Sequence, residues 1–308
     1  MRRLIYLRHN GGQLANQLWG YISVYACALE IGIPCENWAF FEYARFFSLP
    51  PVSDPFIRLL YRAYDTLLRI LPERHVKRFL RKVYGAYIRI RYLSGSHAVV
   101  QSGDSPSLHG PYYLPPDTRA AALPAVPDGQ DLYFSGWMFR NPAGLTKYRD
   151  AVRTLLSPKP ALLAAARAPL TSVRAPGVKR IIGLHIRQTD FKTFKNGLYY
   201  VPPERFAAAA RAIAETHPGT AFLVCSDAPV DLSLFSGLRC AQGNAGLIGD
   251  LFSLSACDAV VGTNSTFGTL AAYLGNVPHF VLTDASVDWQ AVLSQRTFEF
   301  HDSSIVGF

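Results

Sequence analysis

The chain has 308 residues, of which 49% are hydrophobic and 17% charged, and its net charge is +9. This composition supports a large buried core and excludes an intrinsically disordered chain. The five cysteines form no CxxC pair, the N-terminus lacks the apolar core of a signal peptide, and no stretch reaches the roughly 18 apolar residues of a membrane span, so we expect a cytoplasmic protein with reduced thiols.

The first half of the chain predicts a strand, a glycine loop and a long helix, followed by less regular structure. Residues 2–7 predict the strand and residues 8–13 the loop. Residues 14–32 predict a helix that ends at Gly32. The other predictions for this half are irregular structure over 36–54, two amphipathic helices over about 55–93, loops over 94–130, a strand over 131–139 and a helix over 144–156.

Positive charge is concentrated in one segment of this half. Residues 57–92 hold ten Lys or Arg and two acidic residues, a net charge of +8, so the rest of the chain is nearly neutral. The basic and the apolar positions both follow the helical period. No nucleic-acid-binding motif accompanies the charge, so we expect no nucleic-acid partner. Two interpretations stay open: a merely solvated helix face, or a surface over 56–92 that binds an anionic membrane.

The second half alternates strands with helices. The proline- and glycine-containing stretches 157–160 and 169–177 predict a linker between two domains. Alternation of strand and helix after this linker predicts a parallel sheet with right-handed crossovers. The predicted strands are 180–186, 220–225, 258–262 and 279–282, and the predicted helices are 203–216, about 247–256 and 266–274.

Polar side chains gather where three of these strands end. The first strand contains His185 and leads to Arg187 and Asp190, and the second ends in Ser226 and Asp227. The third leads into "GTNSTFG" (262–268), which opens a helix. Ligands of open α/β sheets bind beyond the carboxyl ends of the strands, so we expect these segments to form one site.

The chemistry of these strand ends indicates a nucleotide diphosphate. Hydroxyl and backbone N–H groups at the start of a helix favour phosphate, and the Arg187 guanidinium can bind two phosphate oxygens at once. The carboxylates of Asp227 and Asp250 are suited to accept hydrogen bonds from a ribose or a base. Asp190 has two open interpretations: a general base, or a group that orients Arg187.

Several other enzyme classes lack their motifs in this chain. No GxGxxG follows the first strand and no GxxxxGK[ST] occurs, which disfavours dinucleotide enzymes and P-loop NTPases. There is no Asp-x-Asp and no cluster with the spacing of metal ligands. We therefore expect a diphosphate site that needs no metal.

Five segments, in the same order, resemble motifs of one enzyme family. "GGQLANQLWGYISVYACALEIG" is similar to "GxLGNQxFxYAxAxALA", and "LHIRQTDF" is similar to "HVRRGDY". "FLVCSDAP" is similar to "FFIFSDDP", and "YFSGWMFRNPAGLTKYRDAVR" to "LxGYFQSEKYFxxYRxxIR". "DLFSLSACDAVVGTNSTFGTLAAYLG" is similar to "DLxLMSxCxxxIxxNSSFSWWAAWL". The chain thus resembles the bacterial α-1,2-fucosyltransferases, within the superfamily of enzymes that use GDP-fucose.

The resemblance implies an α/β fold of the GT-B type, with two Rossmann-like domains facing a cleft. Residues 1–170 would form the acceptor-side domain, with the basic helices at about 55–93 as an insertion, and 171–308 the nucleotide-sugar domain. The implied reaction is inverting transfer of fucose from GDP-fucose to a hydroxyl of a glycan or lipid-linked glycan, without cofactor or essential metal. The implied setting is polysaccharide biosynthesis in the cytoplasm, and the membrane-binding interpretation of 56–92 would place the protein on the inner face of the membrane.

The resemblance also implies a role for single residues, carried over by position. Arg187 would bind the donor diphosphate and His185 the nucleoside side, while Asn16 would approach the donor from the other domain. The implied catalytic residues are Arg187, Asp190 and Asn16, and the implied donor-binding residues are His185, Arg187, Asp227, Asp250, Asn264, Ser265, Thr266 and Phe267.

The chain departs from the family's motifs at a few positions, which keeps alternatives open. Gln188 stands for an arginine, and Thr189 and Ala15 for glycines, while the double tryptophan is absent. One alternative is a GT-B transferase that uses another GDP-sugar. The other is a protein that binds a membrane surface or a polyanion and has a degenerate donor site.

Overall fold

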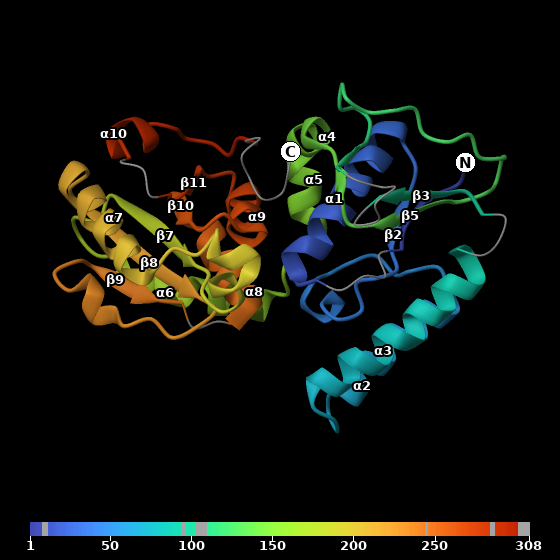
Figure 1. Cartoon of the computed structure of the whole chain (residues 1–308), viewed down its shortest axis with the longest axis horizontal. Coiled ribbons are helices and arrows are strands. Elements are labelled where there is room, and N and C mark those ends of the chain that lie inside the picture. The colour runs from blue at the N-terminus through green and yellow to red at the C-terminus, as the bar shows by residue number, and fades with distance from the viewer. Residues whose placement is uncertain (8–11, 94–96, 103–109, 244–245, 284–286, 301–308) are drawn as a thin grey trace. The chain divides into compact units, whose positions relative to one another are not determined.

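The computed structural model describes residues 1–7, 12–93, 97–102, 110–243, 246–283 and 287–300. The chain divides into two compact units, Met1–Pro158 and Lys159–Gly307, each built around a parallel sheet (Figure 1). The predicted domain boundary at 170 lies within helix α6 (Pro160–Val173). Among the described residues, no helix combines the length and the apolar character needed to cross a bilayer.

Unit 1 contains a four-stranded sheet in the order β2-β1-β5-β3, in which every pair is parallel. A separate parallel pair joins β4 to β6. The strands are β1 (Leu4–Tyr6), β2 (Cys35–Asn37), β3 (Val99–Ser102), β4 (Tyr112–Tyr113), β5 (Leu132–Gly136) and β6 (Phe139–Arg140), and the helices are α1 (Leu14–Ile31), α2 (Pro55–Leu67), α3 (Glu73–Ile88), α4 (Pro142–Lys147) and α5 (Arg149–Leu155).

The strand β1 and the long helix α1 confirm the elements predicted over 2–7 and 14–32, whereas most of the predicted glycine loop over 8–13 lies outside the described residues. The helix ends because Gly32 adopts a left-handed conformation, with φ of 72°, in which its N–H reaches the carbonyls of the last turn. Side chains of β1 alternate between two layers. Ile5 joins the cluster that includes residues of α2 and α3, whereas the ring of Tyr6 lies 6.2 Å from that of Tyr21 in α1.

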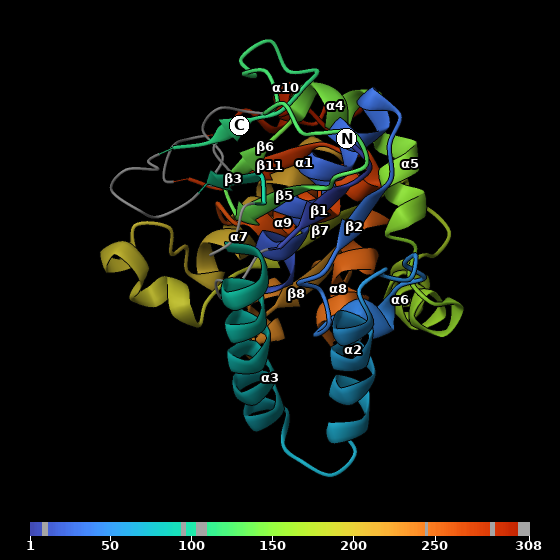
Figure 2. The same ribbon diagram turned by 90° about the vertical axis from the view of Figure 1, so that its right-hand side faces the viewer.

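Helices α2 and α3 form a hairpin that extends from this sheet (Figure 2). Asp54 caps α2 by accepting a hydrogen bond of 3.0 Å from the Ile57 N–H, and Pro55 occupies the first turn, where its missing N–H costs nothing. Each helix buries one side against the cluster around Ile5, as the helical period of the sequence predicts. The buried residues are Ile57, Leu60 and Tyr64 in α2 and Val76, Leu80, Tyr84 and Ile88 in α3.

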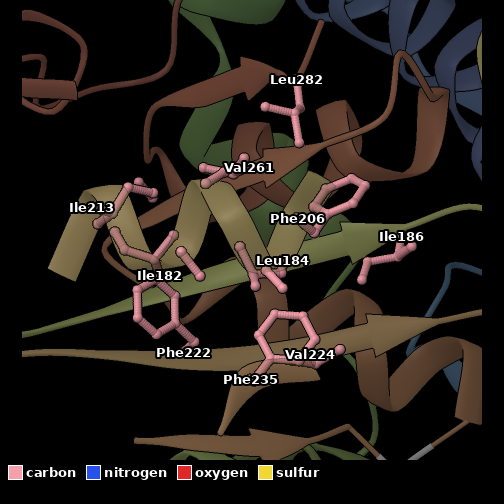
Figure 3. Close-up of a cluster of buried hydrophobic side chains, with 14 of the residues drawn as sticks. Ile182, Leu184, Ile186, Phe206, Ile213, Phe222, Val224, Phe235, Val261 and Leu282 are labelled. Carbon is pink, nitrogen blue, oxygen red and sulfur yellow. The ribbon is translucent and has the colours of Figure 1, made fainter. Parts of the chain in front are cut away.

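Unit 2 contains a five-stranded, fully parallel sheet in the order β11-β10-β7-β8-β9. Alternate residues of β7 pack under helix α7, and Figure 3 shows Ile182 and Leu184 beside Phe206 and Ile213 of that helix. The elements of this unit are β7 (Arg180–Ile186), β8 (Thr220–Ser226), β9 (Cys240–Gln242), β10 (Ala259–Gly262), β11 (His279–Val281), α6 (Pro160–Val173), α7 (Pro203–Thr216), α8 (Gly246–Ser255), α9 (Thr266–Gly275) and α10 (Trp289–Val292).

The prediction of a linker is wrong where α6 forms. This helix runs through Pro169 and buries Ala166, Leu170 and Val173. Ser253 of α8 donates a 2.6 Å hydrogen bond to the Ala166 carbonyl, which ties the helix to the unit. Burial of one helix face thus outweighs the local signal of the prolines.

The predictions of loops over 94–130 and of irregular structure over 36–54 are also wrong in part, because they miss β2, β3 and β4. These strands are short, and their pairing partners are distant in sequence: Val99 of β3 pairs with Tyr133 of β5. All five cysteines are free thiols, and Cys27, Cys225 and Cys257 are buried.

Candidate functional site

Three neighbouring strands of unit 2 end at the same edge of the sheet. In the register of β7 with β8, Ile186 lies opposite Ser226. In the register of β7 with β10, His185 lies opposite Gly262. The segments that follow these strands therefore leave the sheet together, at the edge where ligands of open α/β sheets bind. The structure brings together here the site residues predicted after all three strands.

Arg187 is fixed at this edge by two carboxylates. Its Nε lies 2.8 Å from Asp190 Oδ1 and its Nη2 lies 3.0 Å from Asp190 Oδ2. The same Nε lies 3.1 Å from Asp227 Oδ2. The Arg187 side chain is 13% exposed and that of Asp190 55%. A guanidinium held in one orientation and largely withdrawn from water is suited to bind an anion through two parallel hydrogen bonds.

Asp190 is tied to Arg187 rather than held ready for proton transfer. The Arg187 guanidinium, by hydrogen bond and charge, holds the pKa of the Asp190 carboxyl below its usual range. A carboxylate with a lowered pKa is a weaker base. The geometry therefore favours the second of the two sequence interpretations, in which Asp190 orients Arg187.

Both oxygens of Asp227 accept hydrogen bonds from the segment that follows β7. Oδ1 accepts from the Gln188 N–H at 2.7 Å, and Oδ2 accepts from the Thr189 hydroxyl at 2.5 Å. Because Arg187 also contacts Oδ2, one carboxylate holds three consecutive residues of this segment. Asp227 thus sets the shape of the loop that carries Arg187.

His185 points to the side of the sheet opposite α7. Its ring centroid lies 5.1 Å from that of Phe267 in α9, and the residue is buried. Burial, and then the nearby Arg187 charge, lower the pKa of His185 to about 4, so the ring is neutral near pH 7. Its Nδ1 has no hydrogen-bond partner among the described residues. A neutral imidazole with an unused nitrogen is a polar group that a ligand can satisfy.

Gly268 lies close to this imidazole. A Cβ placed on Gly268 would stand 3.1 Å from His185 Nδ1, which is tighter than ordinary packing. The glycine at the position after Phe267 therefore leaves room for the His185 ring beside the start of α9.

The start of α9 supplies the third part of the site. Ser265 caps the helix, and its hydroxyl accepts a 3.3 Å hydrogen bond from the Phe267 N–H. Ser265 is buried by this role, whereas Asn264 and Thr266 on either side of it are partly exposed. The positive end of the helix dipole lies at these residues and favours a bound anion.

Asp250 of α8 lies near the ends of β8 and β9. Its Oδ1 is buried without a hydrogen-bond partner among the described residues. Burial raises the pKa of Asp250 to about 6, an effect that the Cys225 thiol partly offsets. A Cβ on Gly243 would stand 2.5 Å from Asp250 Oδ1, so only glycine fits there without displacing the carboxylate.

Asn16 belongs to unit 1 and lies in the first turn of α1. Its Oδ1 is buried and has no partner among the described residues, and the same is true of the adjacent Gln17 Oε1. The Gln17 amide donates a 3.1 Å hydrogen bond to the Gly12 carbonyl. Two unsatisfied amide oxygens in one helical turn mark this end of α1 as a second polar feature.

Two residues of the edge, Gln188 and Thr189, were not predicted as site residues, and Ser226 was expected only as a polar strand end. Gln188 is buried, and its amide donates hydrogen bonds to Ser226 Oγ at 3.1 Å and to the Pro229 carbonyl at 3.3 Å. Ser226 in turn donates a 2.8 Å hydrogen bond to the Ile186 carbonyl. Thr189 bonds Asp227. Their sequence signal is their place at the end of β8 or just after β7, two strands that pair in register.

Within the described ranges, no group of three or more His, Cys, Asp and Glu side chains is placed to hold a metal ion. The charges that converge on the edge are those of Arg187, Asp190 and Asp227.

Comparison with known proteins shows similarity of fold. The sequence matches no known protein-family signature and no curated protein. The structure is similar to that of POFUT1 in complex with GDP, with 11% identity, a TM-score of 0.50 and coverage of 91% of this chain and 97% of that one. It is also similar to a mutant of FUT1 from Arabidopsis thaliana in complex with GDP, with 12% identity, a TM-score of 0.52 and coverage of 92% and 71%. POFUT1 in complex with GDP-fucose gives 10% identity, a TM-score of 0.50 and coverage of 91% and 97%.

These similarities extend over both units. Together with the two parallel sheets they confirm the predicted fold class, an α/β fold of the GT-B type with two Rossmann-like units.

Proposed function

We propose that this protein is an inverting glycosyltransferase that transfers fucose from GDP-fucose to a hydroxyl group of a glycan acceptor. The observation that carries the proposal is Arg187, held by Asp190 and Asp227 at the edge of the sheet where the donor of such a fold would bind. Proteins of the same fold, POFUT1 and the plant FUT1, have structures in complex with GDP or GDP-fucose, which supports a guanosine donor.

In this proposal the donor diphosphate lies between Arg187 and the start of α9. Arg187 binds its oxygens, and Asn264 and Thr266 meet it at the positive end of the helix, with Ser265 and the Phe267 backbone supporting that end. The acceptor oxygen attacks C1 of the sugar while the bond from C1 to the diphosphate oxygen breaks, and the proton of the acceptor hydroxyl passes to water or to the leaving diphosphate. Negative charge grows on the leaving GDP, and Arg187 stabilises that charge.

The nucleoside is proposed to lie on the side of His185, Asp227 and Asp250. The unused Nδ1 of His185 and the buried Oδ1 of Asp250 are polar atoms that a bound nucleoside would satisfy. Asp227 already accepts hydrogen bonds from its own loop, so we assign it the positioning of Arg187 and of the segment 187–189. Asp190 is likewise assigned a positioning role.

The proposal also covers the acceptor, the independence of the reaction from a metal ion, and the cellular compartment. Asn16, whose amide oxygen has no hydrogen-bond partner among the described residues, is proposed to contact the donor or the acceptor sugar. The positive charge of Arg187 and the helix end support transfer without a metal ion. A cytoplasmic location and a lipid-linked or free glycan acceptor in polysaccharide biosynthesis complete the proposal; the five free cysteines suit a reducing compartment.

The test is binding and turnover with a panel of nucleotides. Calorimetric titration should show that GDP binds and that ADP and UDP bind at least about tenfold more weakly, a difference of about 1.4 kcal/mol. Release of GDP from GDP-fucose, GDP-mannose and other GDP-sugars then identifies the sugar. Turnover of a different GDP-sugar would keep the fold assignment and replace fucose. If the folded protein does not bind GDP, the proposed donor site is refuted. The alternative, a membrane- or polyanion-binding protein with a degenerate donor site, is then favoured.

A further inference from the structure

The helices α2 and α3 carry a repeated sequence. Residues 58–70 read RLLYRAYDTLLRI and residues 78–90 read RFLRKVYGAYIRI, with identical residues at five of the thirteen positions. The structure shows its meaning, because the two copies place equivalent residues in equivalent surroundings.

The shared buried positions hold both helices on unit 1. Leu60 and Tyr64 of the first copy lie in the same hydrophobic cluster as Leu80 and Tyr84 of the second. This part of the repeat is explained by packing on the sheet.

The exposed positions of the repeat are not explained by packing. Leu59 is 61% exposed and its equivalent Phe79 is 59% exposed. Ile70 is 74% exposed and its equivalent Ile90 is 76% exposed. In each copy the first apolar side chain lies within a helix and the second follows eleven residues later, just beyond the end of α2 for Ile70 and in the π-helical segment Arg89–Leu93 for Ile90. Exposed apolar side chains that recur at equivalent positions of a repeat mark a candidate interaction surface.

Basic residues accompany these apolar side chains at matching positions. All six are exposed, and within the described part of the chain none forms an ion pair with a carboxylate. By contrast, Lys77 pairs with Glu73 at 3.0 Å, and Arg81 pairs with Glu42. The six residues are Arg58, Arg62 and Arg69 in the first copy and Arg78, Lys82 and Arg89 in the second.

We propose that these exposed positions form a face that binds an anionic lipid bilayer. The hairpin face is defined as Leu59, Ile70, Phe79 and Ile90 with the six basic residues named above. Long basic side chains meet anionic headgroups while apolar ones enter the acyl boundary, which is the composition of interfacial helices. Nucleic acid fits less well, because three of the four apolar residues are aliphatic and do not stack on bases. This inference is independent of the donor site.

The experiment measures co-sedimentation of the protein with two kinds of vesicle. One contains phosphatidylcholine alone, and the other contains about 30% phosphatidylglycerol as the anionic lipid of the membrane surface. We expect binding to the anionic vesicles that weakens as salt rises. Leu59→Ser with Phe79→Ser, and separately Arg62→Gln with Lys82→Gln, should each reduce the partition coefficient by about tenfold or more. Thermal unfolding should match wild type, because these side chains are exposed.

Matched controls separate this face from general charge and hydrophobicity. Lys159→Gln with Arg167→Gln removes the same charge from unit 2, and Leu198→Ser removes an apolar side chain that is 70% exposed there. Both should bind vesicles as wild type does. Equal binding to neutral and anionic vesicles, or no loss in either hairpin variant, would overturn the proposal. Duplex RNA that displaces the protein from vesicles, with Leu59→Ser and Phe79→Ser still bound, would instead identify a nucleic-acid face.

Discussion

Arg187 and Asp190 form a bidentate ion pair, in which Arg187 Nε lies 2.8 Å from Asp190 Oδ1 and Arg187 Nη2 lies 3.0 Å from Asp190 Oδ2. The two residues are three positions apart, at the point where the chain leaves β7. Asp227, which follows the neighbouring strand β8, contacts the same Nε at 3.1 Å. The guanidinium is therefore oriented before any ligand arrives, which reduces the cost of ordering it during a reaction.

Arg187→Ala should lower kcat by about 10²–10³-fold, because it removes the group that stabilises charge on the leaving diphosphate. Arg187→Lys should also be poor, since a point charge cannot bind two oxygens in parallel. Transfer assays and circular dichroism measure the two effects. Arg180→Ala is the matched control, because Arg180 begins the same strand at its opposite end. Wild-type turnover in folded Arg187→Ala would refute the diphosphate assignment.

Asp190→Asn should lower kcat by less than about tenfold, because the Asn oxygen still accepts a hydrogen bond from Arg187, and the pH profile of kcat should keep its shape. Asp190→Ala should lower kcat further. A general base would behave differently. Both variants would then lose about 10²–10⁴-fold, and the acidic limb of the profile would disappear. Steady-state measurement of kcat over about pH 5–9 distinguishes the two roles, because the acidic and basic limbs of a pH profile fall in this range.

Transfer should persist in excess EDTA. Arg187 and the start of α9 supply positive charge to the diphosphate, so the leaving group does not depend on a metal ion. The assay compares initial rates with and without EDTA. A complete loss of activity that magnesium or manganese restores would contradict the proposed metal-independent mechanism.

Asp250→Asn should stabilise the protein at pH 7–8 while weakening GDP binding. Burial raises the pKa of Asp250 from 3.8 to about 6, so its ionisation costs stability above pH 6, by at most about 3 kcal/mol. The cost is absent below the unfolded pKa, grows as pH rises from there to the folded pKa, and is complete above it. The gain in the variant should therefore shrink as pH falls from 6 to 4. Urea unfolding across this range measures it, and a gain independent of pH would contradict the assignment.

The local elements of the second unit were predictable from the sequence because they depend on short-range patterns. Apolar runs bounded by polar residues specified β7, β8 and β10, and the alternation with helices specified a parallel sheet. From there, the rule that ligands bind beyond strand ends was enough to select Arg187, Asp190 and Asp227. The family resemblance identified the fold class, which the structural similarities confirm.

Tertiary structure decided which of these side chains touch. The segment 187–189 and Asp227 are 38 to 40 positions apart in sequence, and only the register of β7 with β8 brings the Thr189 hydroxyl within 2.5 Å of that carboxylate. The burial that shifts the pKa of His185 and Asp250 has no local signature either, because it depends on α8 and α9 covering one side of the sheet. The same holds for α6, whose prolines indicate a break while its buried face stabilises a helix. Periodicity is a local property of the chain, whereas contact, burial and charge pairing depend on which distant segments meet.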